Sequence, residues 1–176
     1  MRAVVVYESM YGNTRFVAEQ IATGLRSRCD VQIIPVHEAT EDLTAQADLV
    51  VAGGPTHIHG MSSSKSRAQA VAAAGKPVGG LTVEPDAAGP GLRDWFATLS
   101  QVSGKSAAAF DTRLEAAALL TGRASHGIAH RLRKHGFLLI VEPESFLVTK
   151  QDRLADGEAD RARQWGADLA DTLVRS

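Results

Sequence analysis

The sequence contains little cysteine, few aromatic residues and no excess of either charge. Its one cysteine, Cys29, excludes an internal disulfide and any metal site built from several thiolates. Nineteen Lys and Arg residues against 20 Asp and Glu residues give a formal net charge of −1, so no strong field attracts nucleic acid. The apolar run at residues 3–6 is too short for a signal peptide core or a membrane span. We therefore expect a cytoplasmic protein that neither binds nucleic acid nor inserts into a membrane.

Apolar side chains, by contrast, are plentiful. Hydrophobic residues make up 44% of the chain and charged residues 22%, which is ordinary for a globular protein and unlike a disordered one. A length of 176 residues predicts one domain, residues 1–176.

Short apolar runs alternate with helical patterns along the chain. The expected strands cover residues 3–7, 31–36, 49–52, 107–110 and 137–141, the last of which could extend through 145–148. The expected helices cover the segment after Thr14 and residues 62–74, 92–99, 125–134 and 158–174. Ser62 or Ser63 could cap the second of these helices, Ser125 could cap the fourth, and Gly136 is expected to end the fourth. This alternation predicts an α/β fold in which helices cover both faces of a parallel sheet. Five strands in a chain of this length favour the strand order 2-1-3-4-5.

A candidate anion site lies between the first expected strand and the first expected helix, at Ser9-Met10-Tyr11-Gly12-Asn13-Thr14. Ligands of open α/β sheets bind at this edge, and a helix N-terminus offers unpaired N–H groups. Gly12 allows close backbone approach, and Ser9, Asn13 and Thr14 bring short polar side chains. These residues could also form a plain turn and helix cap, but the whole set favours an anion site. The loop has no lysine for a triphosphate, so a monophosphate fits better.

Two further loops are expected at the same edge of the sheet. Gly53-Gly54-Pro55-Thr56-His57-Ile58-His59-Gly60-Met61 follows the third strand, and its glycines would let a flat ligand approach the backbone. A plain Gly-Pro turn is the alternative for this loop. Phe110-Asp111-Thr112-Arg113 ends the fourth strand.

The first loop resembles the FMN-phosphate loop of the flavodoxin family, Ser/Thr-x-Thr-Gly-Asn-Thr, with matches at Ser9, Gly12, Asn13 and Thr14 and a departure at Tyr11. Its Ser-Met-Tyr-Gly stretch and the later Gly-x-Pro-Thr also resemble WrbA-type quinone reductases. The resemblance implies a flavodoxin-like three-layer fold with a five-stranded parallel sheet, FMN as cofactor and a function in electron transfer. It implies phosphate contacts from Ser9, Met10, Tyr11, Gly12, Asn13 and Thr14, and ring contacts from Pro55, Thr56, His57, Ile58, Asp111, Thr112 and Arg113.

The sequence departs from the family around the flavin ring. The family often stacks a tyrosine there, whereas here we expect stacking from His57, Ile58, Met61 or a side chain near Leu114. His57, His59 and Arg113 would place positive charge beside the ring and favour its two-electron-reduced anion. His126 and His130 share a helix face but lack the Glu of His-Glu-x-x-His, so no metal site is expected.

Three functions are compatible with these features. The favoured one is an electron carrier that acts with a redox protein partner. The second is an NAD(P)H- or quinone-linked FMN oxidoreductase, which the WrbA-like loops support and the missing Gly-Thr-Gln-His segment opposes. The third is a flavin-free interaction module on the same fold, which the missing ring stackers support. The sequence leaves the oligomeric state open.

Overall fold

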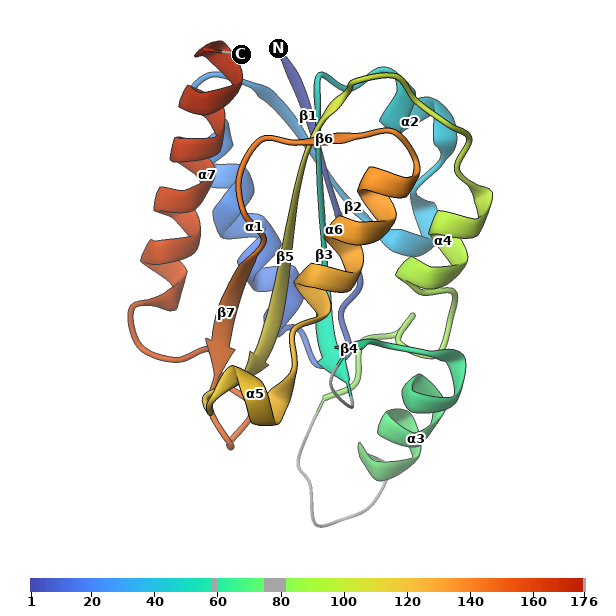
Figure 1. Cartoon of the computed structure of the whole chain (residues 1–176). Coiled ribbons are helices and arrows are strands. Elements are labelled where there is room, and N and C mark those ends of the chain that lie inside the picture. The colour runs from blue at the N-terminus through green and yellow to red at the C-terminus, as the bar shows by residue number, and fades with distance from the viewer. Residues whose placement is uncertain (58–59, 75–81, 176) are drawn as a thin grey trace.

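The computed structural model describes residues 1–57, 60–74 and 82–175, and parallel strands form its centre (Figure 1). The strands are β1 (Arg2–Tyr7), β2 (Asp30–Pro35), β3 (Leu49–His57), β4 (Gly60–Met61), β5 (Ser106–Leu114), β6 (Leu138–Leu139) and β7 (Glu144–Val148). The sheet runs in the order β2-β1-β3-β5-β6, and β7 also pairs with β5. All these pairings are parallel, while β4 pairs antiparallel with β3. The predicted α/β fold and the order of its main strands are confirmed.

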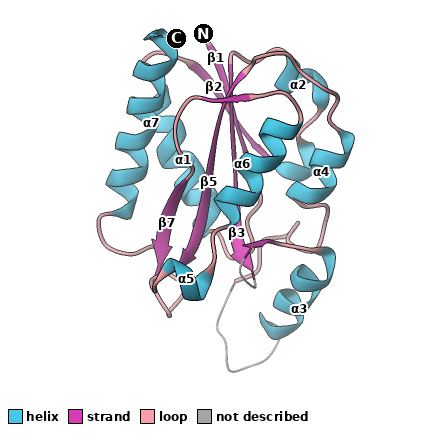
Figure 2. Ribbon diagram, in the orientation of Figure 1, coloured by secondary structure: helices cyan, strands magenta, loops and turns pink. Residues whose placement is uncertain are grey.

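Helices cover both faces of the sheet (Figure 2). The helices are α1 (Asn13–Leu25), the 3-10 helix η1 (Val36–Glu38), α2 (Glu41–Ala45), α3 (Ser64–Ala74), α4 (Leu92–Thr98), α5 (Ala118–Thr121), α6 (Ala124–Lys134) and α7 (Glu158–Arg175). Helices α1 and α7 pack against each other on one face, and α4 and α6 lie on the other. No helix in the described ranges is long and apolar enough to cross a membrane.

Side chains of the central strands alternate between two apolar cores. Val4 and Val6 of β1 belong to the core under α4 and α6, and Ala3 and Val5 belong to the core under α1 and α7. All four are buried, as expected for a strand that is covered on both faces. This explains why β1 is a continuous apolar run rather than an alternating one.

Strand β3 is longer than the expected 49–52, because it continues through Gly53, Gly54 and Pro55 to His57. The added Cβ of any other residue at position 53 would overlap the ring of Phe110 on the neighbouring strand. The glycine therefore makes room for a core aromatic side chain, and the prediction that the strand ends at residue 52 was wrong. The continued strand places Thr56 and His57 at the carboxyl edge of the sheet.

The expected fifth strand is divided in two. β6 pairs only with the start of β5, at Ser106 and Ala107, and β7 pairs with its end, from Phe110 to Leu114. Pro143 lies in the gap and has no N–H to donate to a sheet ladder. This division adds one strand and β4 adds another, so the described sheet has seven strands instead of five.

Local signals at helix ends were partly correct. Ser63 caps α3, because its Oγ accepts from the N–H of Ser66 at 3.1 Å. Gly136 follows α6 with a left-handed φ of 88°, as predicted. Ser125, the predicted cap of α6, instead lies inside a helix that begins at Ala124.

Candidate functional site

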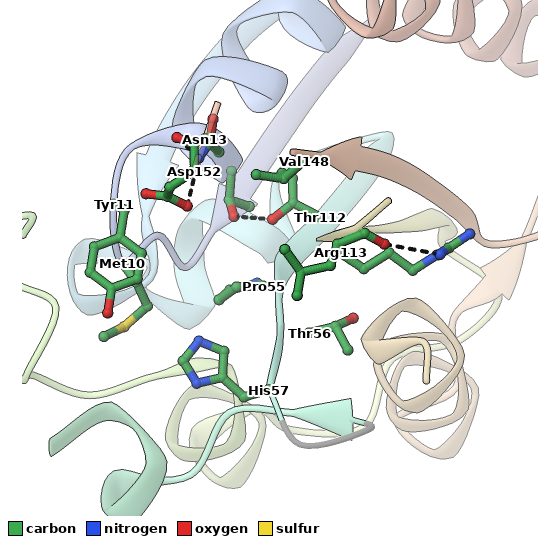
Figure 3. Close-up of a pocket in the computed structure, with 12 residues that line it drawn as sticks. Met10, Tyr11, Asn13, Pro55, Thr56, His57, Thr112, Arg113, Val148 and Asp152 are labelled. Atoms are coloured by element: carbon green, nitrogen blue, oxygen red, sulfur yellow. Dashed lines mark hydrogen bonds between the residues drawn. The ribbon is translucent and has the colours of Figure 1, made fainter. Parts of the chain in front are cut away.

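A cavity of about 200 Å³ lies at the carboxyl edge of the sheet, between the ends of β3, β5 and β7 and the start of α1 (Figure 3). It is lined by Met10, Tyr11, Asn13, Thr14, Pro55, Thr56, His57, Thr112, Arg113, Leu114, Val148 and Asp152. Most of these are residues that the sequence predicted for a ligand site. Ser9, Gly12 and Asp111 do not line the cavity, and Ile58 and His59 lie outside the described residues.

The first loop turns sharply into α1 at Gly12. This residue has a φ of 93°, and its N–H donates to the Oγ of Ser9 at 3.1 Å. A side chain at this φ would be strained, so the turn favours glycine. The N–H groups at the start of α1 have no carbonyl one turn earlier and carry the positive end of the helix dipole. Ser9 and Gly12 thus fix the conformation of the loop without lining the cavity, while Asn13 and Thr14 line it.

Both of these cavity-facing residues are bound to distant parts of the chain. The amide of Asn13 donates to the backbone oxygen of Asp152 at 3.1 Å and to its carboxylate Oδ1 at 3.2 Å. The hydroxyls of Thr14 and Thr112 lie 2.7 Å apart and share a hydrogen bond. Burial raises the pKa of Asp152, and the hydrogen bond from Asn13 opposes that shift. The β7–α7 turn therefore places a carboxyl group at the end of the cavity where the sequence predicts an anion.

Thr56 lines the cavity with its hydroxyl turned away from it (Figure 3). That hydroxyl accepts from the N–H of Ala124 at 2.9 Å and donates to the Oδ2 of Asp111 at 3.2 Å. Its donor and one acceptor site are thereby used inside the protein. The ring contact expected from Thr56 stays a prediction, with one acceptor site of this hydroxyl left for a ligand.

Asp111 lies behind Thr56 and is fully buried. Its Oδ2 also accepts from the N–H of Ser125 at 2.8 Å, while its Oδ1 has no hydrogen-bond partner among the described residues. Burial raises the pKa of this carboxyl, and the hydrogen bonds from the N–H of Ser125 and the hydroxyl of Thr56 oppose the shift. Asp111 therefore holds Thr56 and the first turn of α6 by hydrogen bonds and does not itself line the cavity.

His57 lines the cavity at the end of β3. Burial lowers the pKa of its imidazole from the ordinary 6.5, the nearby Glu8 carboxylate raises it, and Arg67 lowers it again. The net shift is downward, so the imidazole is neutral at pH 7. The expectation that His57 brings positive charge to the site is corrected accordingly.

A buried polar cluster lies beneath the first two loops. The carboxylate of Glu8 accepts from the hydroxyl of Ser62 and from the N–H of Leu92, the latter at 2.8 Å. Arg67 donates to the same Ser62 hydroxyl at 3.2 Å and pairs with Asp94 at 2.9 Å. The cluster joins the first loop to α3 and α4, a link that the sequence analysis did not predict.

Arg113 directs its charge away from the cavity. Its Nη1 donates to Leu114 O at 3.3 Å, to Ala116 O at 2.7 Å and to the hydroxyl of Thr121 at 3.3 Å. The guanidinium thus holds the segment that leads into α5. Two leucines of α5 are strongly exposed, Leu119 at 92% and Leu120 at 70%. Leu114, itself 53% exposed, connects this apolar segment to the cavity.

An aromatic side chain does lie at the cavity. Tyr11 lines it, and the Tyr11 hydroxyl donates to the carbonyl of Ala70 at 3.1 Å. The expectation that no tyrosine is available there was therefore wrong. Val148 and Asp152 were missed, because neither belongs to a recognisable motif and only the fold brings them to the first loop.

The chain matches the family model described as "Flavodoxin domain" over residues 4–124. No curated protein matches the sequence. Solved structures that resemble it include a flavodoxin from the domain Archaea, with 23% identity, a TM-score of 0.67 and 99% of both chains covered. Flavodoxin 1 from Bacillus cereus has 20% identity and a TM-score of 0.67, covering 99% of this chain and 98% of that one. A flavodoxin, WrbA-like protein from Agrobacterium tumefaciens has 21% identity and a TM-score of 0.61, with 99% and 98% covered. At these identities the structural matches show the fold.

Proposed function

Because the chain belongs to the flavodoxin domain family, we propose that it binds FMN non-covalently in this cavity and acts in electron transfer. The observation that carries the proposal is the convergence of the Ser9–Thr14 loop, the end of β3 and the end of β5 on one cavity. A bound FMN would supply one- and two-electron chemistry at its ring, and the protein would supply position and electrostatics.

The residues present suit such a ligand in chemical character. The start of α1, whose entry the left-handed Gly12 shapes, would hold the phosphate together with Asn13 and Thr14. Pro55, His57, Tyr11 and Leu114 offer apolar or aromatic surface for a flat ring. The cavity is smaller than the roughly 300–1,000 Å³ of typical small-molecule sites. It would therefore enclose only part of FMN and leave the remainder open to a partner.

The chain's own side chains give the site little positive charge. His57 is neutral at pH 7, and the guanidinium of Arg113 is bound to the α5 segment. His57 therefore brings no positive charge to a ring, and the charged end of Arg113 is held at the α5 segment. We propose an electron carrier that works with a redox protein, with NAD(P)H- or quinone-linked catalysis as the alternative. A cytoplasmic location is also proposed, supported by the one cysteine, Cys29, which is free and buried.

The test is the visible absorption spectrum of the purified chain before and after FMN is added and the sample desalted. We expect a shifted flavin band that survives desalting. Gly12→Ala should lose it, because an added side chain is strained at this φ and lies 3.2 Å from the Oε1 of Glu84. Gly157→Ala is the matched control, since Gly157 also has a positive φ but nothing lies within 4 Å of its added Cβ. A wild-type protein that is colourless after desalting would support the flavin-free interaction module instead.

A second measurement separates carrier from enzyme. NAD(P)H oxidation is followed in the presence of the FMN-loaded protein and a quinone. A carrier shows no oxidation above that of free FMN, whereas sustained turnover establishes the oxidoreductase.

A further inference from the structure

Asp152 occupies an unusual position beside the first loop. It has a φ of 55° and is the one non-glycine residue with positive φ in the described part of the chain. Such backbone is uncommon outside glycine, although Asp and Asn tolerate it best. Its carboxyl group lines the cavity next to Asn13 and Tyr11 (Figure 3). The conformation is held by Asn13, which binds both the backbone and the side chain of Asp152.

The contact between Asn13 and Asp152 uses the side-chain N–H groups of Asn13, a residue that the sequence predicted to contact a ligand. The amide nitrogen of Asn13 has two hydrogens, and it donates to the backbone oxygen of Asp152 at 3.1 Å and to the carboxylate Oδ1 at 3.2 Å. The acceptor is therefore a carboxylate that belongs to the protein. The site already contains an anion at the start of α1, where helix geometry favours negative charge.

No described residue of the cavity lining forms an ion pair with this carboxylate. The other ionisable residues there are Tyr11, His57 and Arg113. Burial and then the charge of Asp152 raise the pKa of Tyr11, and burial lowers the pKa of His57, so both are neutral at pH 7. Arg113 donates to Leu114, Ala116 and Thr121 instead. A ligand phosphate that approaches Asn13 would thus meet a carboxylate with which no cavity-lining cation among the described residues forms a salt bridge.

We propose that Asp152 is a specificity-determining residue, an internal anion that competes with the phosphate group of the ligand for the amide of Asn13 and the start of α1. This proposal rests on the proposed FMN site and adds that the site discriminates between flavins with and without a phosphate group. A phosphate can take the Asn13 amide only when Asp152 gives it up, and two negative groups cannot share that position without repulsion. Riboflavin, which lacks the phosphate, is not subject to this competition. The wild-type site is therefore biased against the phosphorylated ligand.

Two substitutions at this position remove the charge while respecting the backbone. Asp152→Asn keeps the size of the side chain and tolerates a positive φ. Asp152→Gly removes the side chain and relieves any strain at that φ, which guards against a variant that does not fold. Asp156→Asn is the matched control, because Asp156 is an exposed carboxylate of the same β7–α7 connection and does not line the cavity.

The experiment measures dissociation constants for FMN, riboflavin and inorganic phosphate at pH 7 and fixed ionic strength. Flavin binding is followed by fluorescence quenching, and phosphate binding by the amide NMR shifts of Gly12 and Thr14. Both Asp152 variants should bind FMN and phosphate at least about tenfold more tightly than wild type, or about 1.4 kcal/mol. Riboflavin should stay within about twofold of wild type, and Asp156→Asn should resemble wild type throughout.

The proposal is overturned if the Asp152 variants gain no affinity for phosphate. It is also overturned if riboflavin and FMN gain equally, or if Asp156→Asn reproduces the effect. The phosphate titration does not require a flavin. If neither flavin binds to any variant, the proposed function fails, and the phosphate titration alone still decides the role of Asp152.

Discussion

The hydroxyl of Thr56 donates to the buried carboxyl of Asp111, with 3.2 Å between Oγ1 and Oδ2. Thr56 belongs to the cavity lining, whereas Asp111 has no exposed surface. The bond therefore connects a ligand-facing position to an ionisable group in the core. The protonation state of Asp111 therefore affects the hydrogen bond that holds the Thr56 side chain at the cavity.

The first prediction concerns Asp111 and pH. Burial raises its folded-state pKa above the ordinary 3.8, so the folded protein holds this proton at pH values where the unfolded chain has released it. The stability that this provides is present below the unfolded pKa and is lost as pH rises through the folded pKa. We expect the free energy of unfolding of wild type, measured in urea from pH 4 upward, to fall relative to that of Asp111→Asn. Asp156→Asn, at an exposed position, should run parallel to wild type, and parallel curves for all three proteins would contradict the prediction.

The second prediction concerns His57. Burial lowers its pKa and Glu8 opposes that change, so NMR titration of the imidazole should give a midpoint below 6.5. Glu8→Gln should lower the midpoint further, because it removes the negative charge that favours the imidazolium. The effect of pH on stability is opposite to that of Asp111. Below pH 6.5 the unfolded chain binds a proton that folded His57 does not, so the free energy of unfolding decreases as the pH is lowered. His57→Gln assigns the resonance, and a midpoint at or above 6.5 would show that the imidazole is not desolvated.

The third prediction tests the close contact between α1 and α7. A Cβ added at Gly166 would overlap the carbonyl oxygen of Ile21, and one added at Gly24 would overlap that of Arg163. These are backbone atoms, so the helices must separate to admit a methyl group. Gly166→Ala should lower the free energy of unfolding by about 1–3 kcal/mol, against the usual helix preference for alanine. Gly60→Ala is the control, since nothing lies within 4 Å of its added Cβ. An unchanged urea midpoint for Gly166→Ala would mean that the helices are not in close contact.

The fourth prediction tests the hold of Arg113 on α5. The amide hydrogens of Leu120 and Gly122 bond to the carbonyls of Ala117 and Ala118 within the segment that the guanidinium holds. Arg113→Ala should let this segment open more often, with hydrogen exchange of these amides about ten- to a hundredfold faster. The neighbouring exposed Arg123, changed to alanine, should leave the exchange as in wild type. Equal rates for the two variants would show that α5 is held by other contacts.

The fold was predictable from the sequence where local pattern and tertiary role agree. The run at residues 3–6 is apolar because both faces of β1 are covered, and Val17 and Ile21 recur on α1 because one side of that helix is buried. Gly53 was misinterpreted because the reason for a glycine there is the Phe110 ring on another strand. A single sequence contains no local sign of such a contact.

The same distinction holds for the site. Asn13 and Thr14 were found because they belong to a compact motif at the start of a helix. Their partners, Asp152 and Thr112, lie far along the chain and were either missed or assigned another role. The sequence also could not predict the direction of a side chain. Thr56 and Arg113 line the cavity, but the Thr56 hydroxyl bonds to Asp111 and the Arg113 guanidinium bonds to the segment before α5.

The all-parallel pairing of the main sheet has a consequence for how the chain folds. β1 pairs in parallel with β2 and β3, and the chain must cross a face of the sheet between parallel neighbours, so these strands cannot pair through a tight hairpin as β3 and the short β4 do. Every such parallel pairing joins distant residues, which predicts slower folding than in a helical protein of equal stability. During that time the apolar runs of β1 and β3 are unpaired and open to contact with other chains. In the finished sheet they are central, and one of the outer strands, β6, is only two residues long and offers little edge for another chain to extend.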